Sequence, residues 1–180
     1  MNIPNILTVL RFVMIPIFGY FLLTGQYLIG VVLFIIAGFT DVLDGLIARR
    51  FNMVTSWGKF ADPMADKFMQ VTALVILAMK GIIPLAIIII VVAKEVLIAI
   101  GSIMLYEKDD IVVTSNWYGK LATVVFYLAI VMAIIFRINN LKSPYTDIFV
   151  NTFMVIAVLA SLFALLMYFL TYRKIHKEIK

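Results

Sequence analysis

Four aspartates stand close together in one segment of the sequence, residues 41–66, which reads DVLDGLIARRFNMVTSWGKFADPMAD. Asp41 and Asp44 are three residues apart, and Asp62 and Asp66 are four apart. Either spacing places both members of a pair on the same face of a helix. The segment predicts two consecutive helices joined by a short loop, so we expect the two pairs of carboxylates to face each other across a small gap.

The charge of these carboxylates indicates what they could bind. A charged side chain at the centre of a membrane helix costs about 2.5–3.5 kcal/mol on insertion scales, and like charges repel one another. Arg49, Lys59 and Lys67 offer nearby positive charge. A divalent cation offers more, because carboxylate oxygens are hard ligands suited to Mg²⁺, Mn²⁺ or Ca²⁺. Four carboxylates could hold two ions about 3.5–4 Å apart, the arrangement that serves in-line displacement at phosphorus.

The residues between the aspartates suit the binding of a phosphate ester. Gly45 and Gly58 let a ligand approach the backbone closely, and Ala48 keeps the next turn small. Arg49 offers a planar fork to phosphate oxygens. The competing interpretation is that the small residues only allow close helix packing, and that an intramembrane Asp is a satisfied polar contact or part of an ion pathway. Four paired acids with interleaved Gly and Arg favour the metal site.

The composition predicts that the helices carrying these residues lie in a bilayer. The 180 residues are 64% hydrophobic and 14% charged, with a mean hydropathy of +1.11. A soluble domain is about half apolar and a quarter charged. The absence of cysteine excludes disulfides, thiolate metal sites and cysteine nucleophiles. We interpret the net charge of +5 as basic loops facing anionic lipid, not as a nucleic-acid surface.

Six apolar segments are each near the roughly 20 residues that cross a bilayer. Because backbone polar groups in lipid must pair internally, they predict helices, over residues 6–23, 28–49, 58–79, 83–106, 117–136 and 148–172. The expected fold class is all-α, a single domain of residues 1–180 that forms an integral membrane bundle of six transmembrane helices. Basic residues are more frequent on the side of the termini, which predicts that both termini are cytoplasmic.

The pattern of the acidic segment can be compared with known families. It reads D-x-x-D-G-x-x-A-R, then eight residues, then G-x-x-x-D-x-x-x-D. This resembles the signature of the CDP-alcohol phosphotransferase (CDP-alcohol phosphatidyltransferase) family, with every position matched. The opening NIPNILTVLRFVMIP and the block GKFADPMADK are similar to segments of the bacterial phosphatidylglycerophosphate synthases within that family.

The resemblance implies roles for particular residues. Asp41, Asp44 and Asp62 would be metal ligands. Asp66 would complete the second metal site and act as the general base on the acceptor hydroxyl. The resemblance also implies a pocket for the CDP moiety, lined by Gly45, Ala48, Arg49 and Gly58, with Asn5, Thr8 and Thr55 as further candidates for nucleotide contacts.

The resemblance further implies a reaction, partners and a location. The enzyme would transfer a phosphatidyl group from CDP-diacylglycerol to glycerol 3-phosphate and release CMP, a step of phospholipid biosynthesis. Two divalent cations, Mg²⁺ or Mn²⁺, would be its cofactors. It would be a multi-pass homodimer of the cell membrane, in contact with membrane lipid and not with nucleic acid, and its active site would face the cytoplasm.

Three lysines are candidates to hold the phosphate of the acceptor, namely Lys59, Lys94 and Lys120. Lys94 and Glu95 interrupt an apolar helix, and adjacent residues point about 100° apart, so we expect each to need its own partner. The competing interpretation pairs Lys94 with a carboxylate across the bundle and lets Lys120 extend to lipid headgroups. Phosphatidylglycerophosphate synthases typically carry Arg-Glu where this chain has Lys94-Glu95, which is a departure at this predicted site.

Other functions compete with this one. The same chemistry could use phosphatidylglycerol as acceptor, as in cardiolipin synthases, or another alcohol. An aspartate-rich membrane prenyltransferase also binds a diphosphate through metal ions, but its acidic motifs would lie on more distant helices. A transporter predicts acids near the midplane and often an internal repeat. A non-catalytic scaffold gives no reason for four paired carboxylates.

Overall fold

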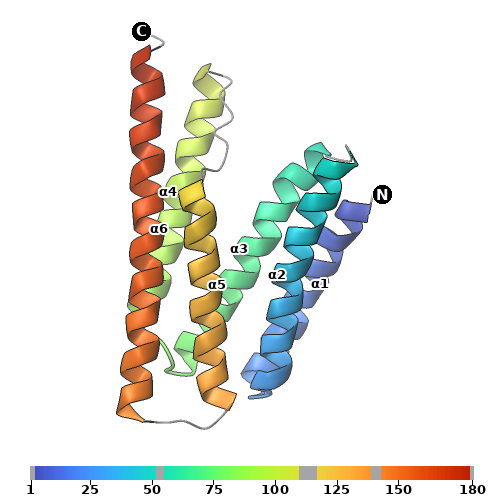
Figure 1. Ribbon diagram of the computed structural model, residues 1–180, viewed down its shortest axis with the longest axis vertical. Coiled ribbons are helices and arrows are strands. Elements are labelled where there is room, and N and C mark those ends of the chain that lie inside the picture. The colour runs from blue at the N-terminus through green and yellow to red at the C-terminus, as the bar shows by residue number, and fades with distance from the viewer. Residues whose placement is uncertain (1–2, 52–54, 110–116, 139–142, 179–180) are drawn as a thin grey trace. The chain divides into compact units, whose positions relative to one another are not determined.

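A computed structural model describes residues 3–51, 55–109, 117–138 and 143–178 (Figure 1). Within these ranges the chain is all-α and has no β-strand. The six helices found there are α1 (Ile3–Leu23), α2 (Tyr27–Arg50), α3 (Ser56–Met79), α4 (Leu85–Asp109), α5 (Trp117–Ile138) and α6 (Pro144–Glu178). The expected fold class and the expected order of helices are therefore confirmed.

Several helix ends differ from the prediction, and two of these differences have identifiable reasons. Helix α3 begins two residues early because Thr55 caps it, its hydroxyl accepting a hydrogen bond from the backbone N–H of Gly58 at 3.0 Å. Helix α6 begins at Pro144 and not at residue 148. Proline is tolerated at the first helical position, and Asp147 in the first turn complements the helix dipole. Residues 144–147 are polar enough to be mistaken for a loop.

Four helices in the described part of the chain are long and apolar enough to cross a membrane. Their candidate spans are Pro4–Leu23, Tyr27–Ala48, Trp117–Ile138 and Pro144–Met167, with mean hydropathies of 2.1 to 2.5. The remaining two helices carry charged residues within their length: Lys59, Asp62, Asp66 and Lys67 in α3, and Lys94 and Glu95 in α4. Six crossings stay a prediction.

The described chain divides into two compact units, each with its own helix packing. The first comprises Met1–Ile82 and Val131–Ser143, and the second comprises Ile83–Ile130 and Pro144–Lys180. In the second unit α4 packs against α6, with Ile87 and Val91 of α4 and Met154 and Ala157 of α6 buried. The prediction that residues 1–180 form one domain stays a prediction.

In the first unit, α1 packs against both α2 and α3, which contact each other much less. The turn from α1 to α2 contains Gly25 at a φ of 79°, a conformation that glycine adopts without steric cost. Beyond this turn α2 runs back along α1, and the rings of Phe18 and Phe34 meet with centroids 5.4 Å apart. The N-terminal ends of α1 and α3 therefore lie beside the C-terminal end of α2 (Figure 1).

Helix α1 presents one buried stripe to its two neighbours. The buried residues of this stripe recur at helical spacing, with polar Thr8 and Arg11 in its first half and apolar residues in its second: Pro4, Thr8, Arg11, Met14, Phe18 and Leu22. At the apolar end, Gly30 of α2 lies against Leu22, and a Cβ added there would be 2.8 Å from a Leu22 methyl group. The apolar end thus fixes the approach of α1 and α2, and the polar end lies where the aspartates of α2 and α3 lie.

The packing of α1 on α2 can be tested with two phenylalanines of one helix. Phe34 is fully buried and Phe39 is 64% exposed. We expect Phe34→Ala to lower the free energy of unfolding by about 3 kcal/mol, the lower end of the range for such a truncation, because lipid replaces part of the lost contact. Thermal unfolding of the detergent-purified protein measures the loss. Phe39→Ala is the control, and an equal loss in both variants would contradict this account of the core.

Candidate functional site

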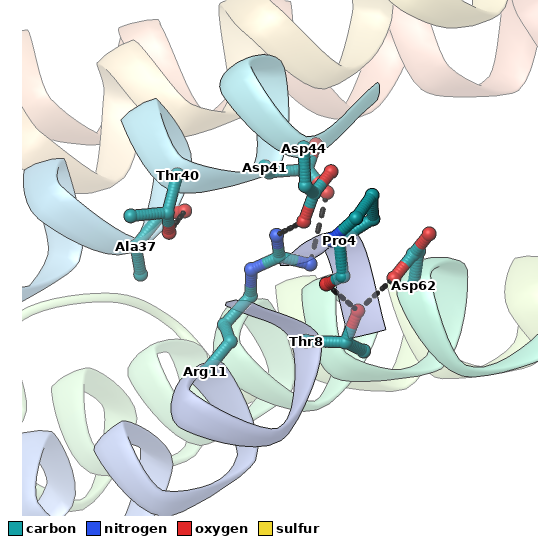
Figure 2. Close-up of polar contacts among 8 residues, drawn as sticks. All are labelled: Pro4, Thr8, Arg11, Ala37, Thr40, Asp41, Asp44 and Asp62. Carbon is teal, nitrogen blue, oxygen red and sulfur yellow. Dashed lines mark hydrogen bonds and ion pairs between the residues drawn. The ribbon is translucent and has the colours of Figure 1, made fainter. Parts of the chain in front are cut away.

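Arg11 is the residue around which the polar end of the first unit is arranged. Its side chain is fully buried, although it lies within the apolar span of α1. Figure 2 shows the guanidinium pointing from α1 to the two aspartates of α2. Its Nη1 lies 3.0 Å from Asp41 Oδ1, and its Nη2 donates a hydrogen bond to Asp44 Oδ2. One cation thus faces the carboxylates of both Asp41 and Asp44.

The two carboxylates differ in their access to solvent. The side chain of Asp44 is 2% exposed and that of Asp41 is 38% exposed. A buried charge costs several kcal/mol unless it is paired, so the contact with Arg11 is what allows Asp44 to be ionised inside the bundle. Asp41 keeps an open side, through which a ligand could reach it.

Thr8 connects α1 to the aspartate of α3. Its hydroxyl is fully buried, donates to Asp62 Oδ1, and lies 3.1 Å from the carbonyl oxygen of Pro4 (Figure 2). A hydroxyl has one hydrogen, so the two acceptors share it. Thr8 and Arg11 are one helical turn apart, and α1 thereby places a donor against Asp62 and a cation against Asp41 and Asp44.

A second polar contact joins the N-terminal ends of α1 and α3. The hydroxyl of Thr55 donates to Asn5 Oδ1 at 2.9 Å and accepts from the backbone N–H of Gly58 at 3.0 Å. A Cβ added to Gly58 would lie 3.2 Å from Asn5 Oδ1 and 3.6 Å from Asp62 Oδ2. Gly58 therefore leaves room for the polar groups around Asp62.

The contacts of α1 thus bring together most of the residues predicted to bind metal or CDP. The other predicted residues of α2 and α3, including Lys59 of the predicted acceptor site, fall into two groups. Gly45, Ala48 and Asp66 are partly buried, on α2 and α3. The side chains of Arg49 and Lys59 lie outside the described part of the structure, although their backbones belong to α2 and α3. Asp66 follows Asp62 by one turn of α3, and both lie in the N-terminal half of that helix.

The expected partners of Lys94 need a correction. Lys94 and Glu95 form an ion pair with each other, with 15% and 19% of their side chains exposed. The expectation that the angle of about 100° between adjacent helix positions keeps the two side chains apart was wrong, because long side chains can reach across it. Lys120 is exposed at the start of α5. The grouping of Lys59, Lys94 and Lys120 around one phosphate stays a prediction.

The predicted metal centre can be compared with this geometry. Among the described residues, no group of three or more His, Cys, Asp or Glu side chains is placed to hold a metal ion. The aspartates are nevertheless close to one another around α1, and the Asp41–Asp44 pair already accepts one cation, the guanidinium of Arg11. Hard oxygen donors held against a positive charge fit a divalent cation. The four metal ligands stay a prediction.

Sequence reasoning missed the role of Arg11. The signal was present, since Arg11 is the one charged residue between Ile3 and Thr40. A charge inside an apolar span is costly and indicates a partner of opposite charge within the bundle. The sequence also places Thr8 three residues before it, on the same helical face.

The fold and the site together define a class of protein, a helical membrane protein with carboxylates gathered at one end of its apolar spans. The sequence model of the CDP-alcohol phosphatidyltransferase family matches residues 1–170. The chain belongs to the CDP-alcohol phosphatidyltransferase family. It is accordingly a membrane transferase of phospholipid biosynthesis, in a family that uses divalent metal ions.

Several curated relatives are similar over much of the chain. A protein of Haemophilus influenzae named CDP-diacylglycerol--glycerol-3-phosphate 3-phosphatidyltransferase is 34% identical over 178 residues, 93% of this chain and 91% of the relative. A Bacillus subtilis protein of the same name is 35% identical over 137 residues, covering 68% and 70% of the two chains. A probable cardiolipin synthase (CMP-forming) of Drosophila melanogaster is 39% identical over 108 residues, 59% of this chain and 34% of the relative.

The hydrogen bonds of Thr55 to Asn5 and to the start of α3 can be tested for their contribution to stability. We expect Thr55→Ala to lower the free energy of unfolding by about 1 kcal/mol, because α3 loses its cap and Asn5 loses a donor. The measurement is thermal unfolding in detergent. Thr123→Ala is the matched control, since the exposed Thr123 hydroxyl bonds to the carbonyl of Gly119 in its own helix. Equal stability of the two variants would argue against the cap.

Proposed function

We propose that this protein transfers a phosphatidyl group from CDP-diacylglycerol to glycerol 3-phosphate and releases CMP. The observation that carries the proposal is the meeting of Asp41, Asp44 and Asp62 around α1, within a segment that has the full acidic signature. Relatives with this activity in their names are similar over as much as 93% of the chain. Apolar spans beside the aspartates suit a lipid substrate whose reactive diphosphate lies at the membrane surface.

The residues that would hold divalent cations are Asp41, Asp44, Asp62 and Asp66, and we propose two ions, Mg²⁺ or Mn²⁺. Bound there, the ions would neutralise the diphosphate and the charge that develops on departing CMP. Asp41 is suited to a ligand from outside because its side chain is 38% exposed. Thr8 would orient Asp62 through its hydrogen bond.

The remaining steps use groups of the chain itself. The acceptor hydroxyl forms a bond to the β-phosphorus while its proton passes to Asp66 as general base. The bond between that phosphorus and the bridging oxygen breaks, and CMP leaves with the electron pair. Further residues are proposed to bind the CDP moiety: Asn5, Thr8, Gly45, Ala48, Arg49, Thr55 and Gly58. The lack of a side chain at Gly58 lets Asn5, Thr55 and Asp62 lie close to the backbone of α3, which supports their common role at one site.

The acceptor and the arrangement in the membrane belong to the same proposal. Lys59, Lys94 and Lys120 are proposed to bind the phosphate of glycerol 3-phosphate, although Lys94 would have to exchange its partner Glu95 for it. We further propose a single domain with six crossings and cytoplasmic termini, a site that faces the cytoplasm, a homodimer, and residence in the cell membrane. The excess of Lys and Arg at the site-bearing end supports this orientation.

A second acceptor, phosphatidylglycerol, is favoured by one observation, the 39% identity to a protein named as a probable cardiolipin synthase. The two functions are separated by measuring CMP release from CDP-diacylglycerol in detergent micelles with one acceptor at a time. We expect release with glycerol 3-phosphate, and its loss when a chelator removes divalent cations. If CMP is released with phosphatidylglycerol but not with glycerol 3-phosphate, phosphatidylglycerol is the acceptor. The transfer of a phosphatidyl group from CDP-diacylglycerol then stays as proposed.

The role of Asp66 as general base can be tested by Asp66→Asn. We expect turnover to fall by a factor on the order of 10²–10⁴, because the acceptor hydroxyl keeps its proton. Thermal stability and the binding of CDP-diacylglycerol should stay near those of the unmodified protein. The control is Asp147→Asn, an exposed aspartate in the first turn of α6, which should leave turnover unchanged. Normal turnover of Asp66→Asn would remove this residue from the mechanism.

A further inference from the structure

The hydrogen bonding of Arg11 is incomplete although its side chain is fully buried. A guanidinium has five N–H donors. Nη2 hydrogen-bonds Asp44, and Nη1 is within ion-pair distance of Asp41. Within the described structure, Nε and Nη1 have no hydrogen-bond partner. Arg11 therefore acts on Asp41 mainly through its charge, and this contact lacks the directional bonds of a bidentate pair.

The charges around Arg11 do not balance. Asp62 accepts from Thr8, which lies one helical turn of α1 from Arg11 and its two aspartates (Figure 2). Three carboxylates and one guanidinium leave two negative charges without a counter-charge among these four side chains. One divalent cation would supply that charge. The cation and Arg11 would then carry the same sign of charge beside the same carboxylates, and they would repel each other.

We propose that Arg11 is a positioning residue that serves as a built-in counter-ion for Asp41 and Asp44 in the metal-free protein, and that it weakens their affinity for divalent cations. It holds the two carboxylates in place before a metal ion arrives. A bound ion would compete with the incompletely bonded guanidinium for the carboxylate of Asp41, whose other side is open to solvent. This inference rests on the proposed binding of metal by the aspartates.

The affinity of the purified, full-length protein for Mn²⁺ tests this inference without measuring activity. Arg11→Gln removes the charge and keeps a hydrogen-bonding side chain of moderate length. We expect it to bind Mn²⁺ about tenfold more tightly or better, measured as free Mn²⁺ by electron paramagnetic resonance, because the competing cation is gone. In the presence of a chelator, the same variant should unfold at a lower temperature than the unmodified protein.

Two further variants complete the experiment. Lys80→Gln removes an exposed cation at the other end of the first unit, where it hydrogen-bonds the carbonyl of Leu23, and should leave the affinity for Mn²⁺ unchanged. Arg11→Lys keeps the charge but not the fork that reaches two carboxylates. If Arg11→Gln does not fold, Arg11→Lys takes its place, and added Mn²⁺ should raise its unfolding temperature by more than that of the unmodified protein.

The outcomes separate this inference from the proposed function. An equal affinity for Mn²⁺ with and without the Arg11 charge would show that Arg11 only packs the helices, and would overturn the inference while the metal site stands. The same conclusion follows if Mn²⁺ stabilises Arg11→Lys no more than the unmodified protein. If neither the unmodified protein nor any Arg11 variant binds Mn²⁺, both the metal site and the inference fail.

Discussion

The first unit depends on the burial of one guanidinium against two carboxylates. Arg11 lies inside α1, and its charge would be costly there without Asp41 and Asp44, which belong to α2. The aspartates need Arg11 equally, because Asp44 is almost without access to solvent. This mutual requirement fixes the rotation of α1 against α2, since turning either helix about its axis would separate opposite charges in an apolar surrounding.

The two halves of helix α1 make different contacts. The half near Phe18 and Leu22 packs against apolar groups of α2, and glycine at position 30 allows a close approach. The half near Thr8 and Arg11 contacts the aspartates of α2 and α3. Close apolar packing at one end thus holds the polar groups at the other end at fixed positions, as the proposed metal site would require.

An excess of negative charge connects this architecture to the chemistry of the family. The contacts of Arg11 and Thr8 hold three carboxylates near one another but do not neutralise them. Such a cluster favours cations, and through them it favours a substrate that carries a diphosphate. Apolar spans lie beside this cluster of carboxylates, and they suit the lipid part of that substrate. Charge and hydropathy thus favour a reaction at the membrane surface.

The sequence by itself determined the helical class, because the apolar runs have the length of a membrane span, and it determined the pairing of Asp41 with Asp44 and of Asp62 with Asp66, because helical periodicity fixes which residues share a face. Only the tertiary structure decided that Arg11 meets Asp44, 33 residues away, and that Thr8 meets Asp62, 54 residues away. The ion pair between Lys94 and Glu95 was likewise visible only in the tertiary structure. Periodicity is local, whereas contacts between helices depend on how distant apolar stripes pack and on which rotamers the charged side chains adopt.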